Sequence, residues 1–475
     1  MAIREKSVIP LADLNDYFKS AAYLNSTDVY GVDVDYETKT FKRLGAAAEL
    51  TSGADFDGIE PWNRRTCILS DSGEVIAYKG DDGFTETGLL EKAVTVNGVT
   101  YPIGTPVQVM VEQRKFYYKV VPVKLSTETN RGYGNNLLHA RYYVSVSPES
   151  LKYGFKLHPA FVENGNQNDV IYLSAYICSL YNKLSNGFIN SQGFFYDNNV
   201  YSGTDENGRK TYTYKIPLEN LVLCSRVIDD SVSRVLFSNG EDVRIKCLRK
   251  TVHNRGTGWE SMYIATLSAS QLLMLIECAG LDAEEIIGSS SYRGEENLIN
   301  ESAYIEGIYL SNFKAPEYYD ENISGSGRNG QYYIADHDFE NTSYHTFVED
   351  LAEEPLPAPP YYASNIAAPI LRTFNIGGVN TGFYYDFFGY SPDYDWLFVP
   401  SDCHPGKGSS KTMGFFAALE DNETDFTGEQ IIIKSLDYNI YCDGYSYMTS
   451  SENLMSDAFF ARMVFVPSKK TSVKE

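Results

Sequence analysis

The chain has 475 residues, 43% of them hydrophobic, so it is long enough for two or three domains with buried cores and is not disordered as a whole. Its 40 basic and 63 acidic residues give a net charge of −23, which repels phosphate backbones and anionic membranes and argues against nucleic-acid binding. The 38 tyrosines suit β-strands, and in a secondary role they suit adaptable binding surfaces.

The cysteines and apolar runs indicate where the protein is made. The cysteines are widely spaced and form no CxxC pair, which predicts buried free thiols from a reducing cytoplasm. We expect no signal peptide behind the first charged residues and no membrane insertion, because no apolar run approaches the length of a membrane span. The cysteines are Cys67, Cys178, Cys224, Cys247, Cys278, Cys403 and Cys442.

Residues 1–135 have the pattern of a β-rich module. After a short amphipathic stretch at 11–22, alternating apolar residues predict a series of short strands. Asn97-Gly98 predicts a tight hairpin. The polar, glycine-containing residues 126–136 predict a domain boundary. The predicted strands are 29–36, 40–44, 66–69, 74–78, 93–96, 100–101, 107–111 and 115–121.

Residues 136–475 have a mixed α and β pattern. Alternation predicts strands at 142–146 and 170–176, and one helix is expected over 268–278, with Gly280 as its C-cap. An acidic, proline-rich loop is expected at 349–360, because proline cannot pair within a central strand. Aromatic, glycine-punctuated strands then close on 461–467.

No pattern points to catalysis. His158, His253 and His404 are far apart in the sequence and are expected to be structural or surface residues. Residues 406–411 lack the spacing of a phosphate-binding loop, no GxSxG segment occurs, and adjacent Cys403 and His404 do not face each other. We therefore expect that the chain is not an enzyme and binds no cofactor. The acidity would suit a bound divalent cation, but no motif supports one.

Several segments in preserved order resemble a family of virion and tail proteins from phages of gut bacteria. The most specific is the Arg-Gly-Thr-Gly-Trp run at 255–259, followed by the helix with Leu272, Leu275 and Ile276. The resembling segments are 108–119, 153–162, 169–176, 255–259, 267–279, 287–288, 292–298, 395–400 and 460–465.

This family is similar to the C-type-lectin-like fold of phage tropism determinants and formylglycine-generating enzymes. The resemblance implies an α+β chain in which a β-rich module, residues 1–135, docks on the virion. A C-type-lectin-like domain with long loops, residues 136–475, would follow. The expected motif residues are Arg255, Gly256, Gly258, Trp259, Leu272, Leu275, Ile276, Trp396 and Arg462. We expect Trp259 in the core, Trp396 and Arg462 in strands, and the helix to lay one apolar stripe on a small sheet.

The chain departs from the family at two places. Residues 298–302 replace a tryptophan-containing segment, and a Gly-Gly-x-Trp run near the end is absent. Cys403 and Cys442 match no cysteine pair of the enzyme branch, so its activity is not implied. Because of these departures, the resemblance supports the fold better than it supports a mode of ligand binding.

The resemblance implies a phage fibre or adhesin at the virion surface, on the tail or the head. Its partners would be other virion proteins, a bacterial surface glycan or protein, and two further copies in a homotrimer. Receptor contacts are expected in the loop before the final strand, where tyrosines gather, although a trimer interface would use them equally well. These residues are Tyr438, Tyr441, Tyr445, Tyr447 and Asn453. A decoration protein with a role in assembly only, and a polysaccharide-degrading enzyme, are the alternatives.

Overall fold

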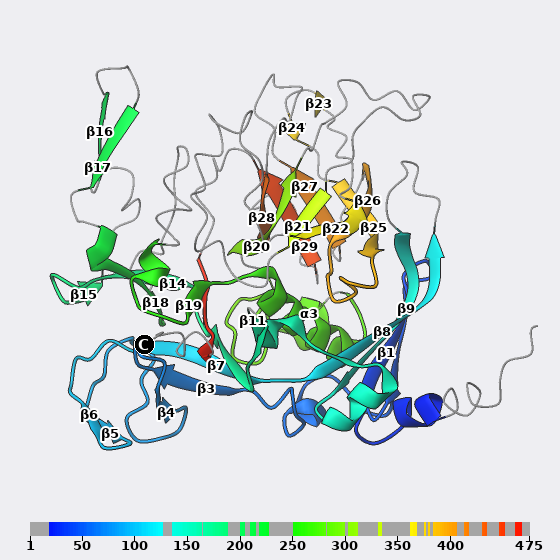
Figure 1. Ribbon diagram of the computed structural model, residues 1–475, viewed down its shortest axis with the longest axis horizontal. Coiled ribbons are helices and arrows are strands. Elements are labelled where there is room, and N and C mark those ends of the chain that lie inside the picture. Colours follow the sequence, from blue (N-terminus) through cyan, green and yellow to red (C-terminus); the bar gives the residue numbers. More distant parts are fainter. Residues whose placement is uncertain are drawn as a thin grey trace, which may run out of the picture.

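A computed structural model describes most of the first 300 residues and shorter segments thereafter (Figure 1). The described residues are 19–126, 135–163, 165–188, 200–204, 210–214, 218–227, 250–281, 283–299, 303–311, 331–334, 362–367, 375–376, 379–380, 383–405, 413–417, 430–434, 446–451 and 461–467. The expected proline-rich loop at 349–360 lies outside them.

The chain is sheet-rich and mixed α+β, with several antiparallel sheets. The larger of its two main sheets has 13 strands. Ten of them follow the order β10 (Lys156–Leu157), β8 (Tyr117–Ser126), β9 (Asn135–Ser145), β25 (Phe383–Tyr390), β27 (Met413–Ala417), β29 (Ser446–Ser451), β28 (Gln430–Lys434), β20 (Ala303–Ser311), β21 (Gln331–Ile334) and β22 (Tyr362–Ala367). The other three are β1 (Tyr30–Asp35), β2 (Thr40–Gly45) and β26 (Pro400–Pro405).

The second main sheet has six strands and is built from distant parts of the chain. Its order is β19 (Trp259–Ser261), β30 (Met463–Phe465), β13 (Val170–Ser174), β7 (Gln108–Arg114), β3 (Arg65–Leu69) and β4 (Val75–Tyr78). β30 therefore lies between two strands that precede it by about two hundred residues or more, and pairs with both. The consecutive strands β7 and β8 belong to different sheets, so they are not a pair.

Smaller elements complete the described part of the chain. One three-stranded sheet contains β15 (Gly187–Phe188), β14 (Cys178–Asn182) and β18 (Leu221–Ser225). The two-stranded pairs are β5 (Val94–Val96) with β6 (Val99–Tyr101), β11 (Val162–Glu163) with β12 (Asn166–Gln167), β16 (Val200–Thr204) with β17 (Lys210–Tyr214), and β23 (Asn375–Ile376) with β24 (Val379–Asn380). The helices include α3 (Ile264–Cys278), α4 (Ala283–Ile287) and the 3-10 turns η1 (Ala54–Phe56), η2 (Pro148–Tyr153), η3 (Pro159–Phe161) and η5 (Leu218–Asn220). Described residues 19–24 and 250–253 are also helical.

The local sequence signals for strands and turns are confirmed. The predicted hairpin is β5–β6, and its two turn residues have φ of 51° at Asn97 and 81° at Gly98. Positive φ at both positions is the geometry of a type I′ turn, whose twist matches that of the flanking strands. Asparagine and glycine accept it at low cost.

The sheets and the core cross the expected boundary near residue 135. β8 and β9 pair with each other on either side of it, and β1 also pairs with β9. One continuous hydrophobic cluster extends from Val32 to Val466. Residues before and after 135 therefore share sheets and bury their apolar side chains together.

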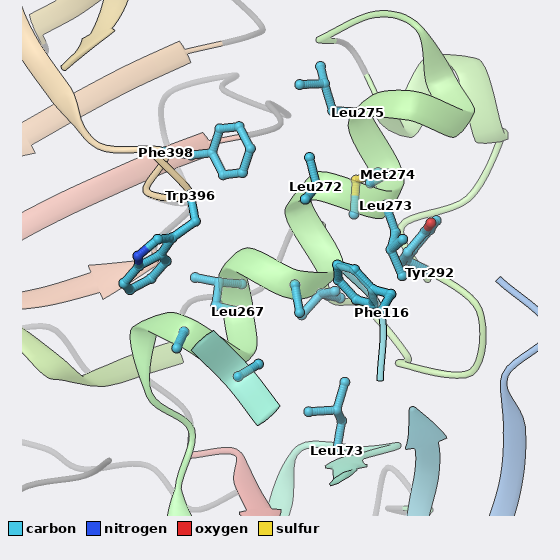
Figure 2. Packing of buried hydrophobic residues seen from close by; sticks show 14 of the residues in the cluster. Phe116, Leu173, Leu267, Leu272, Leu273, Met274, Leu275, Tyr292, Trp396 and Phe398 are labelled. Carbon is cyan, nitrogen blue, oxygen red and sulfur yellow. The ribbon is translucent and has the colours of Figure 1, made fainter. Parts of the chain in front are cut away.

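Helix α3 lies at the centre of this cluster, and all fifteen of its residues are buried. In Figure 1 it lies between the strands around β1, β8 and β9 and those around β27, β28 and β29. Figure 2 shows Trp396 and Phe398 on one side of the helix and Phe116 and Leu173 on another. The expected single apolar stripe is therefore wrong, because a helix buried on every side needs apolar or hydrogen-bonded residues all around.

The bounds of α3 also differ from the expected 268–278. The helix begins earlier, at Ile264. Ser268 therefore lies inside the helix, where its Oγ donates to the carbonyl oxygen of Ala265 at 3.0 Å. At the other end Ala279, with φ of 46°, takes the left-handed C-cap position expected for Gly280. Gly280 instead makes room for Ile286, whose Cδ1 lies 2.5 Å from where a Cβ would stand.

Candidate functional site

Of the expected receptor-binding residues, the structure describes the backbone of Tyr447 alone. Tyr438, Tyr441, Tyr445 and Asn453 lie outside the described residues. Tyr447 belongs to β29, where it is the register partner of Gly414. β29 pairs with β27 on one edge and β28 on the other, so this residue occupies an inner strand of the large sheet, where a loop was expected. A receptor-binding role for these residues stays a prediction.

The Arg-Gly-Thr-Gly-Trp segment binds the turn between β3 and β4 through an ion pair and a hydrogen bond to Asp71. The buried guanidinium of Arg255 forms an ion pair with Asp71 and donates from Nε to the carbonyl oxygen of Leu223 at 3.0 Å. Trp259 is buried, as expected, and its indole Nε1 donates to the backbone oxygen of Asp71 at 2.8 Å. The segment therefore ties β18 and β19 to a turn more than 150 residues earlier.

Gly258 of this segment and Gly73 of the turn that it contacts make room for one aromatic ring. Gly258 has φ of 91°, and a Cβ there would stand 2.7 Å from Cε2 of Phe465. Gly73, in that turn, has φ of 75°, and a Cβ there would overlap the same ring. Gly256, with φ of 130°, has only the Asp71 carbonyl oxygen within 4 Å of a Cβ. Only glycine combines the positive φ with the close approach of Phe465.

Arg462 joins three of the segments that carry the family resemblance. It precedes β30 directly, rather than lying in a strand, and its side chain is buried. Nη1 donates to the carbonyl oxygen of Ser174 at 3.0 Å, and Nη2 donates to that of Glu296. The hydroxyl of Ser174 donates to the Met463 carbonyl at 2.6 Å, which adds a side-chain link to the strand pairing.

Trp396 lies in the turn between β25 and β26, not in a strand as expected. It packs against His158, with ring centroids 6.2 Å apart. His158 is fully buried, and Nδ1 accepts the amide of Ala160 at 3.2 Å. Nε2 therefore carries the proton and faces the hydroxyl of Ser268 at 3.3 Å. Burial lowers the pKa of His158 to about 3, so the residue is neutral and structural.

Asp395, beside Trp396, is a second buried ionisable group. Its carboxylate accepts the Tyr118 hydroxyl at 2.6 Å and the Lys156 ammonium at 3.0 Å. Burial raises the pKa of Asp395, although both partners act in the opposite direction. Burial, and then the contact with Asp395, hold the pKa of Tyr118 well above its usual range. This cluster anchors the 391–399 turn to β8 and β10.

Sequence reasoning missed a buried charge network around α3. Arg64 donates to Glu295 at 2.6 Å and to the Ser270 hydroxyl at 2.9 Å. Arg293 donates to both carboxylate oxygens of Glu277, each at 2.6 Å. The resemblance at 292–298 was the available signal, because it contains Arg293 and Glu295, but it gave them no partner.

Burial makes the described thiols poor nucleophiles. Cys67, Cys178, Cys224 and Cys278 are free and buried, as expected. Burial raises the pKa of Cys178 and Cys278 to about 12 and that of Cys224 to about 11. Since the thiolate is the reactive form, these side chains act as small apolar groups at neutral pH.

The described part of the chain lacks two kinds of feature, a metal-binding cluster and a membrane-spanning helix. No three His, Cys, Asp or Glu side chains come together there as a metal site would require. No helix within the same residues is long and apolar enough to cross a membrane. The polar groups resolved around α3 and β30 bind one another and fix the packing of distant segments.

Searches of known protein families and of curated proteins each return no match to this chain.

Proposed function

We propose that this chain is a structural protein of a bacteriophage particle, a tail or head fibre that binds a glycan or protein on the bacterial surface. Its second part would be a C-type-lectin-like domain. The observation that supports this most is the meeting of the resembling segments in one packed unit. β13 from 169–176 pairs with β7 from 108–119 and with β30 from 460–465, and Arg462 ties 292–298 to the same place.

This convergence matters because the outermost of these segments, 108–119 and 460–465, lie far apart in the sequence. Here the shared residues are buried and touch: Phe465 packs on Trp259 with ring centroids 5.0 Å apart. On this proposal the resemblance lies in residues that hold the fold together, and the loops between them are free to differ in what they bind.

The decisive experiment locates the protein within an intact phage particle by electron cryomicroscopy. We expect its density to project from the tail or the head, with three copies around a symmetry axis. Density within the capsid shell, or absence from purified particles, would contradict a fibre. Light scattering of the purified chain at micromolar concentration tests the homotrimer, and a monomer at every concentration would overturn it.

Host adsorption tests the binding face. Tyrosine rings stack on sugars and their hydroxyls reach polar groups, so the Tyr445→Ala/Tyr447→Ala double variant should assemble but lose adsorption to host cells. The Tyr445→Phe/Tyr447→Phe variant keeps both rings and serves as the matched control for damage to β29. Normal adsorption by the alanine variant, or its failure to assemble, would remove these tyrosines from the receptor site.

A decoration protein that acts in assembly only is the second candidate. It is favoured by one observation: Tyr447 lies in a strand paired along both edges, whereas receptor contacts commonly lie on loops. A chain that is present on particles but binds neither host cells nor glycans would support this candidate over the adhesin.

A further inference from the structure

Val94, Val96 and Tyr101 of the β5–β6 hairpin are half-buried and pack against the hydrophobic core, and one carboxylate adds hydrogen bonds to its turn and its second strand. Glu74, which directly precedes β4, accepts a hydrogen bond from Nδ2 of Asn97 at 2.7 Å. Its other oxygen accepts the hydroxyl of Tyr101 at 2.5 Å. Both donors belong to the hairpin, so the Glu74 side chain binds the turn and β6 at once.

Asn97 is followed by Gly98, and both are exposed at the turn. A Cβ on Gly98 would meet nothing within 4 Å, so the space around its backbone is open. An asparagine in such a position is open to attack by the amide nitrogen of the next residue. Glycine offers no side chain to hinder that attack.

We propose that Asn97 is a site of spontaneous deamidation and that Glu74 protects it. The amide nitrogen of Gly98 attacks Cγ of Asn97, a carbon–nitrogen bond forms, and Nδ2 leaves as ammonia with the proton from Gly98. Water then opens the five-membered imide at either carbonyl, giving aspartate or isoaspartate. While Nδ2 donates to Glu74, the amide is held on the carboxylate, so the hairpin must release it first.

Opening of this hairpin is a local event. It has two strands of three residues each, and a two-stranded ribbon is marginally stable in water by itself. Residues 97–100 are exposed, and exposed surface elements open locally far more often than a whole chain unfolds. The rate of deamidation in the folded protein therefore depends on how often the hydrogen bond between Asn97 and Glu74 breaks.

The chemical step then prevents closure. Aspartate at position 97 places a second carboxylate beside Glu74, and like charges at hydrogen-bonding distance repel. Isoaspartate adds a carbon to the main chain, so the two-residue turn no longer fits the register of Val96 with Val99. Deamidation thus breaks the contact between the hairpin and Glu74 irreversibly.

The test follows the deamidation of the full-length folded protein at mildly alkaline pH by peptide mass spectrometry. Asn186-Gly187 is an internal control, because Asn186 is also exposed with φ of 52° but lies far from Glu74 in the sequence and on another hairpin. We expect Glu74→Ala to accelerate deamidation at Asn97 about tenfold, the effect of losing two hydrogen bonds, and to leave Asn186 unchanged. Tyr101→Phe, which removes one of the two, should give a smaller acceleration.

Two results would overturn the proposal. One is an equal rate at Asn97 in the wild type and in both variants. The other is that Asn97 stays intact in the folded variants while the urea-unfolded wild type converts. In the Asn97→Asp variant, we expect hydrogen exchange at Val96 and Val99 to be about tenfold faster than in the wild type, and unchanged exchange would contradict the release of the hairpin.

Discussion

Arg64 and Glu295 form a 2.6 Å ion pair in which the two side chains are only 1% and 3% exposed. They come from the segment before β3 and from the turn after α4, and Ser270 of α3 bonds to both. A charge this deep is stable only while its partner is present. The pair therefore fixes how two distant segments meet the helix.

Removing one member of this pair should be costly. Arg64→Met leaves Glu295 buried with its charge uncompensated, and we expect the free energy of unfolding to fall by about 3–5 kcal/mol. Urea denaturation measures the change. The Arg64→Met/Glu295→Gln double variant removes both charges and should recover a large part of the loss. Equal stability of the single variant and the wild type would show that the pair contributes little.

The close approach of Gly258 to Phe465 predicts a steric cost. Gly258→Ala should destabilise the fold by about 1–3 kcal/mol through overpacking, in addition to the strain of a positive φ. Gly80→Ala is the matched control, because Gly80 has φ of 101° but nothing within 4 Å of a Cβ. The difference between the two variants in thermal or urea unfolding isolates the contact with Phe465. If both lose the same stability, the ring has moved aside.

Leu275 tests the packing of α3. It is completely buried, so Leu275→Ala should lower the free energy of unfolding by about 2–5 kcal/mol through loss of contacts and a cavity. Ile286→Ala removes a comparable side chain that is 39% exposed and should cost clearly less. Similar losses at the two positions would contradict the central placement of the helix.

His158 predicts a pH dependence with a definite sign. Its pKa is about 3 in the folded protein and 6.5 in its ordinary state, so between these values the unfolded chain binds a proton that the folded chain refuses. The free energy of unfolding should therefore fall as the pH falls from about 6.5 toward 3, by at most about 1.4 kcal/mol per pH unit from this group. Above pH 7 the group should have no effect.

The measurement compares urea unfolding of the wild type and of His158→Asn over that range. Asparagine can still accept the Ala160 amide as the cap of η3, but it does not titrate. Carboxylates titrate in both proteins, so the difference in slope belongs to His158. Parallel curves would mean that the histidine is accessible to water.

Short-range structure was predictable because its causes are local. The β5–β6 hairpin follows from Asn97-Gly98, and β3 and the centre of α3 follow from runs of apolar residues. The start of α3 was not predictable, because Ser268 and Ser270 are residue types that favour the N-cap of a helix and so suggested a later start. Their hydroxyls instead bond within the helix and to Glu295, and no local pattern reveals that partner.

The buried ion pairs could not be predicted, because their two members lie far apart in the sequence. Arg64 and Glu295 are separated by 231 positions, and Arg255 and Asp71 by 184. A charged residue next to an apolar run looks like any solvated residue until the fold supplies its partner. The separation into modules near residue 135 rested on a polar stretch, and such a stretch also occurs between two paired strands.

The central position of β30 sets an order of events during synthesis. The ribosome makes β19 and β13 long before β30, so each of these strands first emerges with an open edge facing the place where β30 will lie. Open edges pair readily with other chains. Until residues 463–465 arrive, the nascent protein is therefore exposed to aggregation, and premature termination before them should yield insoluble product rather than a shorter soluble one.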